Sequence, residues 1–125
     1  MSGYMVIQSY RDLIVWQKSM QLVVAVYALT ENFPRSEVYG LTSQMRRSAV
    51  SIPSNIAEGR RRSTKKDFRQ FINIAFGSGA ELETQLEISK QLPFGKGLNY
   101  SLADNLLAEV MKMLNALSNK LQAAS

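Results

Sequence analysis

Residues 101–123 read SLADNLLAEVMKMLNALSNKLQA, and this stretch carries the clearest structural signal in the chain. Its apolar residues recur at intervals of three or four: Leu102, Leu106, Val110, Met113, Leu117 and Leu121. This spacing places them on one face of an α-helix. No segment of the sequence alternates apolar and polar residues for long enough to predict a β-sheet. The pattern therefore indicates an all-α protein built from amphipathic helices.

The same periodicity recurs in three earlier segments, which glycine and proline residues separate. We predict helices over residues 12–32, 40–61, 64–91 and 101–123. Three of the expected starts carry Ser or Thr followed by an acid three residues later, at residues 9–12, 64–67 and 101–104, which is the capping-box pattern. Short connections favour antiparallel neighbours, so we expect residues 1–125 to form one domain, an antiparallel up-down-up-down four-helix bundle.

The composition narrows the functional classes. The 125 residues include no cysteine and no histidine, which excludes disulfide frameworks, Cys/His metal sites and His-assisted nucleophiles. We therefore expect no catalytic residues, no metal and no cofactor. The longest apolar run is far too short to span a membrane, and the first residues do not resemble a signal peptide. We expect a soluble, cytoplasmic protein that acts in binding or assembly rather than as an enzyme.

The first expected helix has two apolar faces. The face that we expect to point into the bundle contains Leu13, Trp16, Met20, Val23 and Tyr27. The second face contains Val15, Leu22, Val26, Leu29 and Phe33. Because every helix of a four-helix bundle has an outer side, we predict that this second face is the interface of a homo-oligomer. The alternative is that the apolar segment at residues 4–7 folds over it.

The positive charge is concentrated in one part of the chain. The net charge is +5, yet residues 46–69 alone hold eight basic and two acidic residues. The basic residues are Arg46, Arg47, Arg60, Arg61, Arg62, Lys65, Lys66 and Arg69. Such a cluster pairs with the phosphates of RNA or DNA without reading their sequence. We predict nucleic-acid binding at the turn between the second and third helices; the alternatives are a solvated turn or a dock for an acidic protein partner.

Polar residues also recur at helical spacing along the second and third helices. The expected polar layer comprises Gln44, Arg47, Ser51, Asn55, Glu58, Glu81 and Gln85. If the two stripes face each other, they form a hydrogen-bonded layer in which Arg47 and Glu81 are candidates for an ion pair. An enzyme would use Glu58 or Glu81 as a general base. No nucleophile, metal set or phosphate-binding glycine loop accompanies these residues, so we favour a structural role.

Several motifs together resemble one protein family. They are DLIVWQKSM at residues 12–20, FP at 33–34, YGL at 39–41, QMRRSAVSIPSNIAEG at 44–59, and GS at 77–78 with ELETQL at 81–86. Over about residues 10–95 the sequence resembles the bacterial four-helix-bundle family, also called 23S rRNA intervening-sequence proteins. The resemblance implies a ring-shaped homopentamer of antiparallel bundles. The accessory variability determinant of diversity-generating retroelements looks like a relative, which implies the alternative of an adaptor that serves a reverse transcriptase.

Overall fold

The computed structural model of the protein describes residues 9–123. This part of the chain contains four α-helices and two short 3-10 helices. The α-helices are α1 (Ile14–Thr30), α2 (Leu41–Arg60), α3 (Lys65–Gln91) and α4 (Ser101–Ala123). The 3-10 helices are η1 (Tyr10–Asp12) and η2 (Arg35–Glu37). The prediction of an all-α protein with four helices is confirmed, because each observed boundary lies within two residues of the expected one.

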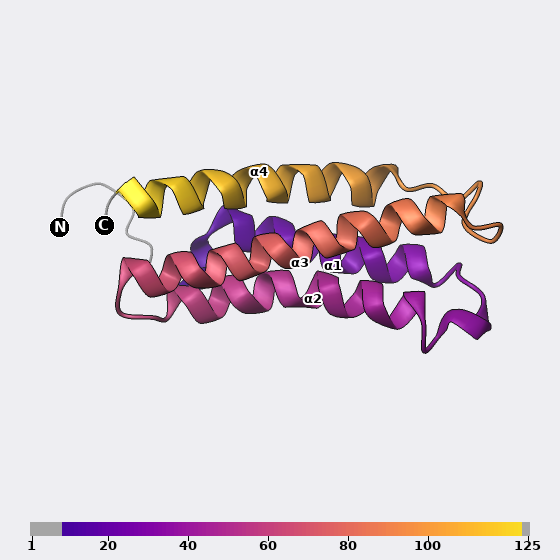
Figure 1. Ribbon diagram of the computed structural model, residues 1–125, viewed down its shortest axis with the longest axis horizontal. Helices are drawn as coiled ribbons and strands as arrows, with labels where there is room; N and C mark the ends of the chain where they lie inside the picture. The colour runs from indigo at the N-terminus through magenta and orange to yellow at the C-terminus, as the bar shows by residue number, and fades with distance from the viewer. Residues whose placement is uncertain (1–8, 124–125) are drawn as a thin grey trace.

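The four helices lie side by side along the long axis of the molecule (Figure 1). The connections from α1 to α2 and from α3 to α4 lie at one end, and the turn from α2 to α3 lies at the other (Figure 1). Both α1 and α3 pack against α2 and α4, so each helix has two neighbours. No helix of the described residues is long and apolar enough to cross a membrane.

The core between the helices is almost entirely aliphatic. The large side chains that are less than 2% exposed are Leu22, Val26, Met45, Ile52, Ile56, Ile72, Leu82, Leu86, Val110 and Leu114. Full burial of one such side chain is worth about 1.5–3 kcal/mol, so this core is the main source of the bundle's stability. Helices α3 and α4 also approach each other closely at Gly79 of α3. A Cβ atom at this position would overlap the sulfur of Met111 on α4.

The two faces of α1 are oriented opposite to the prediction. The five residues predicted to form the oligomer interface are all buried, with at most 8% of each exposed. They are Val15, Leu22, Val26, Leu29 and Phe33. That interface prediction is wrong, because these side chains fill the interior of the bundle and leave no surface for another chain. Of the face expected inside, Met20 and Tyr27 are each 41% exposed. Its other members, Leu13, Trp16 and Val23, are half-buried against the edge of the core. Residues 4–7, the alternative cover, lie outside the described residues.

Local polar contacts stabilise the helix starts, but only some of them are the capping boxes that the sequence predicts. Ser9 and Asp12 form a reciprocal capping box at η1, and Thr64 Oγ1 accepts a hydrogen bond of 3.1 Å from the Asp67 amide. At α4, Asn99 accepts a hydrogen bond from the Ser101 amide at 3.0 Å. The Ser101 side chain therefore does not form the third expected box, and Asn99, two residues before the helix, binds the first helical amide instead.

Asp104, the acid of that third expected capping box, connects α4 to the end of α3. Lys90 Nζ lies 2.8 Å from Asp104 and 2.7 Å from Glu87. The hydrogen bond to Asp104, followed by that to Glu87, raises the pKa of Lys90 above its ordinary value of 10.5. Lys90 therefore stays charged, and the link between the two helices persists, throughout the neutral range of pH.

Candidate nucleic-acid interface

The turn between α2 and α3 is the site that the sequence predicts for nucleic acid. We call residues 60–66 the basic turn; Arg61, Arg62, Lys65 and Lys66 in it are all exposed. Gly59, just before it, is buried, and a Cβ atom there would lie 2.7 Å from the Cβ of Phe71 on α3. The absence of a side chain thus lets α2 and α3 pack closely up to the turn. The basic turn forms one end of the bundle, so the exposed side chains of Arg61, Arg62, Lys65 and Lys66 lie at that end (Figure 1).

The charges of the basic turn are only partly neutralised within the chain. Arg62 lies 2.8 Å from Glu58, one helical turn away, and its guanidinium is 4.8 Å from the centre of the Phe71 ring. Within residues 9–123, Lys65 and Lys66 form no ion pair. Both lie in the first turn of α3, where the helix dipole adds further positive potential. The basic turn therefore keeps a net positive charge at its surface.

An aromatic ring lies beside the basic turn, a neighbour that the sequence pattern does not predict. The guanidinium groups of Arg11 and Arg61 lie 5.1 Å and 5.4 Å from the centre of the Tyr10 ring in η1. The same ring packs edge-on against Trp16 of α1, with ring centres 5.2 Å apart. Tyr10 and Arg61 are far apart along the chain, so no local motif connects them. Only the packing of η1 against α2 brings the ring to this end of the bundle.

Arg69 belongs to the predicted basic set but is held by α4. Its Nε donates a 3.0 Å hydrogen bond to the Ser118 carbonyl, and Nη2 donates one of 3.1 Å to Gln122 Oε1. Ser118 Oγ in turn donates a 2.7 Å hydrogen bond to Asn73 Oδ1 of α3. Arg69 therefore fastens α3 to α4, and its guanidinium is less available to a phosphate than those of the basic turn.

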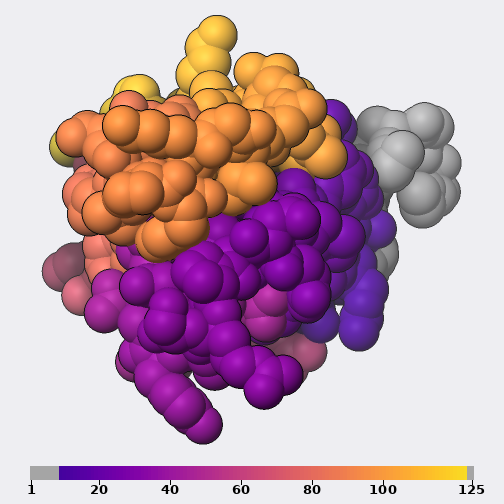
Figure 2. All heavy atoms as spheres, turned by 90° about the vertical axis from the view of Figure 1, so that its right-hand side faces the viewer, coloured from indigo at the N-terminus to yellow at the C-terminus, as the bar shows by residue number. Residues whose placement is uncertain are grey.

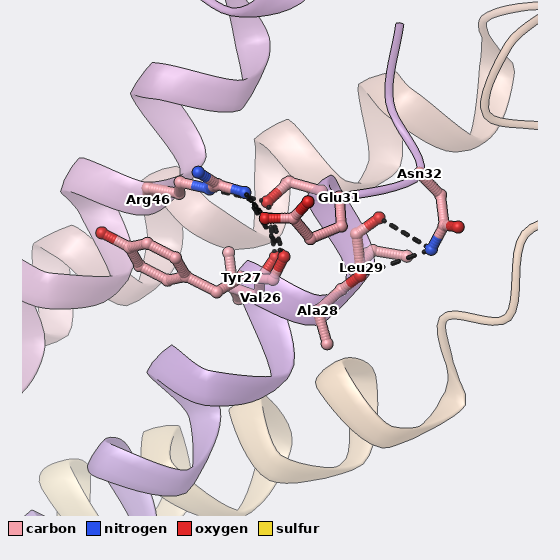
Figure 3. Close-up of polar contacts among 8 residues, drawn as sticks. Val26, Tyr27, Ala28, Leu29, Glu31, Asn32 and Arg46 are labelled. Carbon is pink, nitrogen blue, oxygen red and sulfur yellow. Dashed lines mark hydrogen bonds and ion pairs between the residues drawn. The ribbon is translucent and has the colours of Figure 1, made fainter.

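Arg46 and Arg47 lie apart from the other predicted basic residues. They precede Arg60 by more than three helical turns of α2, which corresponds to about 20 Å along the helix axis. Arg46 is engaged with the end of α1: its Nε donates to Thr30 Oγ1 at 2.9 Å, and its guanidinium covers the Tyr27 ring at 4.4 Å (Figure 3). The eight predicted residues thus do not form one continuous patch.

The predicted polar layer forms only in part. Ser51 of α2 and Ser78 of α3 share a 2.8 Å hydrogen bond, and Asn55 Nδ2 donates to the Ser51 carbonyl at 2.8 Å. No ion pair joins Arg47 to Glu81 in the part of the chain that the structure describes, so this predicted pair is wrong.

The other members of the predicted layer lie outside this hydrogen-bonded group. Both Gln44 and Glu81 are exposed, and Glu58 pairs with Arg62 of the basic turn. Gln85 Oε1 is buried without a hydrogen-bond partner among the described residues. Ser51, Asn55 and Ser78 therefore act as a link between α2 and α3. Nowhere in residues 9–123 do three or more His, Cys, Asp or Glu side chains gather in a way that would hold a metal ion.

Comparisons with known proteins agree with the helical architecture. The family model described as 23S rRNA-intervening sequence protein matches residues 11–116, a range that includes α1, α2, α3 and most of α4. A crystal structure of a protein with unknown function from the S23 ribosomal protein family of Bacteroides thetaiotaomicron is 26% identical, with a TM-score of 0.74. The match covers 84% of this chain and 98% of that one. No curated protein matches the sequence. The chain belongs to the 23S rRNA-intervening sequence protein family.

Proposed function

We propose that this protein is a non-enzymatic nucleic-acid-binding protein that contacts the phosphates of RNA or DNA with its basic turn. The observation that carries the proposal is the pair of exposed lysines at the start of α3, Lys65 and Lys66, beside Arg61 and Arg62. Cations that are not compensated by acids release counterions when they pair with phosphates. Because phosphate contacts carry no base information, the binding is not sequence-specific.

Tyr10 supports the same proposal from a different element. Tyr10 is half-buried at the edge of the basic turn, and two guanidinium groups, those of Arg11 and Arg61, lie over its ring. Aromatic rings next to cations stack on unpaired bases, and such stacking tolerates any sequence. The basic turn and Tyr10 together favour RNA or DNA with unpaired bases over a uniform duplex.

We further propose that the chain assembles as a homopentamer through the outer face of α1. The exposed apolar side chains of this proposed interface are Ile14, Met20 and Val24 of α1, with Leu102 of α4 beside Met20 and Val24. Apolar side chains gathered at the surface in this way are typical of a protein interface. Their location supports self-association, whereas the number five comes from the family resemblance. A ring would present several basic turns and so strengthen nucleic-acid binding through multivalency.

The proposed binding is tested with the double variant Lys65→Ala/Lys66→Ala. We expect a lower affinity for a fluorescent RNA hairpin with an unpaired loop, measured by anisotropy at several salt concentrations. The dependence of log affinity on log salt becomes shallower by about 0.7–0.9 for each phosphate that the variant no longer neutralises. The matched control is Lys96→Ala/Lys112→Ala, which removes the same charge from exposed positions away from the turn.

Two outcomes would count against the proposed function. If both double variants lose affinity equally, the binding follows net charge and does not involve a site at the basic turn. If the wild-type chain does not bind RNA or DNA but binds an acidic peptide through Lys65 and Lys66, the basic turn is a protein-binding site and the chain is an adaptor. Light scattering on the same samples reports whether bound nucleic acid adds to the mass of the assembly.

A further inference from the structure

A groove of about 740 Å³ lies beside the connection from α1 to α2, at the end of the bundle opposite the basic turn. The last turn of α1, the 3-10 helix η2 and the first three turns of α2 line this groove, which is open to solvent. Figure 2 shows the molecule from this end, with the connections from α1 to α2 and from α3 to α4 toward the viewer. The volume falls within the range of small-molecule sites. We call this feature the Arg46 groove.

The Arg46 groove carries an excess of positive charge. Three arginines line it, Arg35, Arg46 and Arg47, against the single acid Glu31. Glu31 lies 3.3 Å from Arg46 and neutralises that side chain in part. Among residues 9–123, neither Arg35 nor Arg47 forms an ion pair, and both are exposed. Two guanidinium groups therefore remain available to an anion, and Arg binds phosphate oxygens in a bidentate manner.

Arg46 is held in place before any ligand arrives. Its Nε donates to Thr30 Oγ1 at 2.9 Å, and Nη2 lies 3.4 Å from the Tyr27 carbonyl and 3.3 Å from Glu31 Oε1 (Figure 3). Thr30, itself only 3% exposed, is fixed by a 2.8 Å hydrogen bond to the Val26 carbonyl. These contacts use Nε and Nη2, and among the described residues Nη1 donates no hydrogen bond. A donor that is already ordered loses little conformational entropy on binding.

Apolar side chains line the same groove. Val38, Val50 and Tyr27 contribute to its walls, and each is between 40% and 44% exposed. An inorganic phosphate would occupy a small part of the volume and would leave these surfaces in water. The combination of guanidinium groups and apolar walls therefore fits a ligand that has an anionic group and a flat, weakly polar group next to each other.

We propose that the Arg46 groove binds a nucleoside phosphate. The phosphate lies among Arg35, Arg46 and Arg47, and the base lies against Val38 and Val50. The ligand is either a free nucleotide or one nucleotide of an RNA or DNA strand, since both present the same chemistry. This site is separate from the basic turn, so it holds or fails independently of the proposed function.

The proposal is tested by titrating the ¹⁵N-labelled full chain with AMP and following its amide resonances. We expect AMP to shift the amides around Val38, Thr42 and Ser43 at lower concentrations than adenosine or inorganic phosphate does. The double variant Arg35→Gln/Arg47→Gln weakens AMP binding by about tenfold or more, because it removes two charged hydrogen-bond donors. Lys112→Gln/Lys120→Gln, which removes the same charge from exposed positions on α4, leaves AMP binding unchanged. The spectra themselves report whether each variant is folded.

A 5′-phosphorylated oligouridylate distinguishes the two sources of the ligand. If it shifts the same amides at much lower concentration than AMP, the groove binds a nucleotide of a strand; equal potency indicates a free nucleotide. Either result supports the groove. The proposal is overturned if neither probe shifts these amides, if the Arg35/Arg47 double variant binds AMP as the wild type does, or if a hexaglutamate peptide shifts them at lower concentration than both nucleotides.

Discussion

The inner and outer faces of α1 are both apolar, and the bundle buries only one of them. The inner face presents Leu22 and Val26, which are not exposed at all, together with the small residues Ser19 and Ala25. The outer face presents Met20 and Val24, which are 41% and 68% exposed. The inner face meets both α2 and α4, so small and branched side chains fit between the helices there. Hydrophobicity alone therefore does not determine which face of a helix is buried.

The substitution Leu22→Glu tests the inner face and has the largest expected effect. It places a carboxylate at a position that is not exposed at all, among aliphatic side chains. We expect a loss of more than about 4 kcal/mol in the free energy of unfolding, which leaves the chain largely unfolded. Circular dichroism during heating measures this change. A cooperative transition close to that of the wild type would show that this face of α1 is not part of the core.

The sequence was sufficient to predict the helices but not the orientation of α1. The apolar periodicity locates all four helices, and polar residues lie near the starts of three of them, because these signals are local. Two apolar stripes on α1 satisfy the same periodicity, so its rotation depends on α2 and α4. The stripe with Trp16 and Tyr27 looks more hydrophobic by size. However, large rings with polar atoms often lie at the edge of a core, and this edge is where Trp16 is found.

The substitution Arg46→Met tests how firmly the end of α1 is attached to α2. It removes the hydrogen bond to Thr30 and the contact with the Tyr27 ring. Since the side chain of Arg46 is 27% exposed, we expect a loss of about 1–2 kcal/mol in the free energy of unfolding. The neighbouring control Arg47→Met, at an exposed side chain, changes it by less than about 0.5 kcal/mol. Urea denaturation compares the two; equal losses would contradict the anchoring role of Arg46.

The candidate sites could be predicted only where the charges are consecutive in sequence. The run Arg60 to Arg62 with Lys65 and Lys66 is visible as a cluster because a single turn holds it together. Proximity in sequence groups Arg69 with them, but its partners are on α4, about fifty residues later. Contacts between residues so far apart leave no local pattern. The same reason hides the Arg46 groove, whose walls come from three separate elements.

The substitution Val24→Glu tests the outer face and has the smallest expected effect on folding. Val24 is 68% exposed, so the free energy of unfolding of the single chain changes by less than about 0.5 kcal/mol. Its effect on assembly is large if the outer face of α1 joins the subunits, because a carboxylate in an apolar interface loses its hydration. We expect light scattering to give a smaller mass for this variant than for the wild type. Ile74→Glu, a similar change at a 47% exposed position on α3, leaves the mass unchanged. If the wild-type chain is monomeric, the outer face of α1 is a solvated surface. If the Val24→Glu variant keeps the mass of the wild-type assembly, the subunits join through another surface.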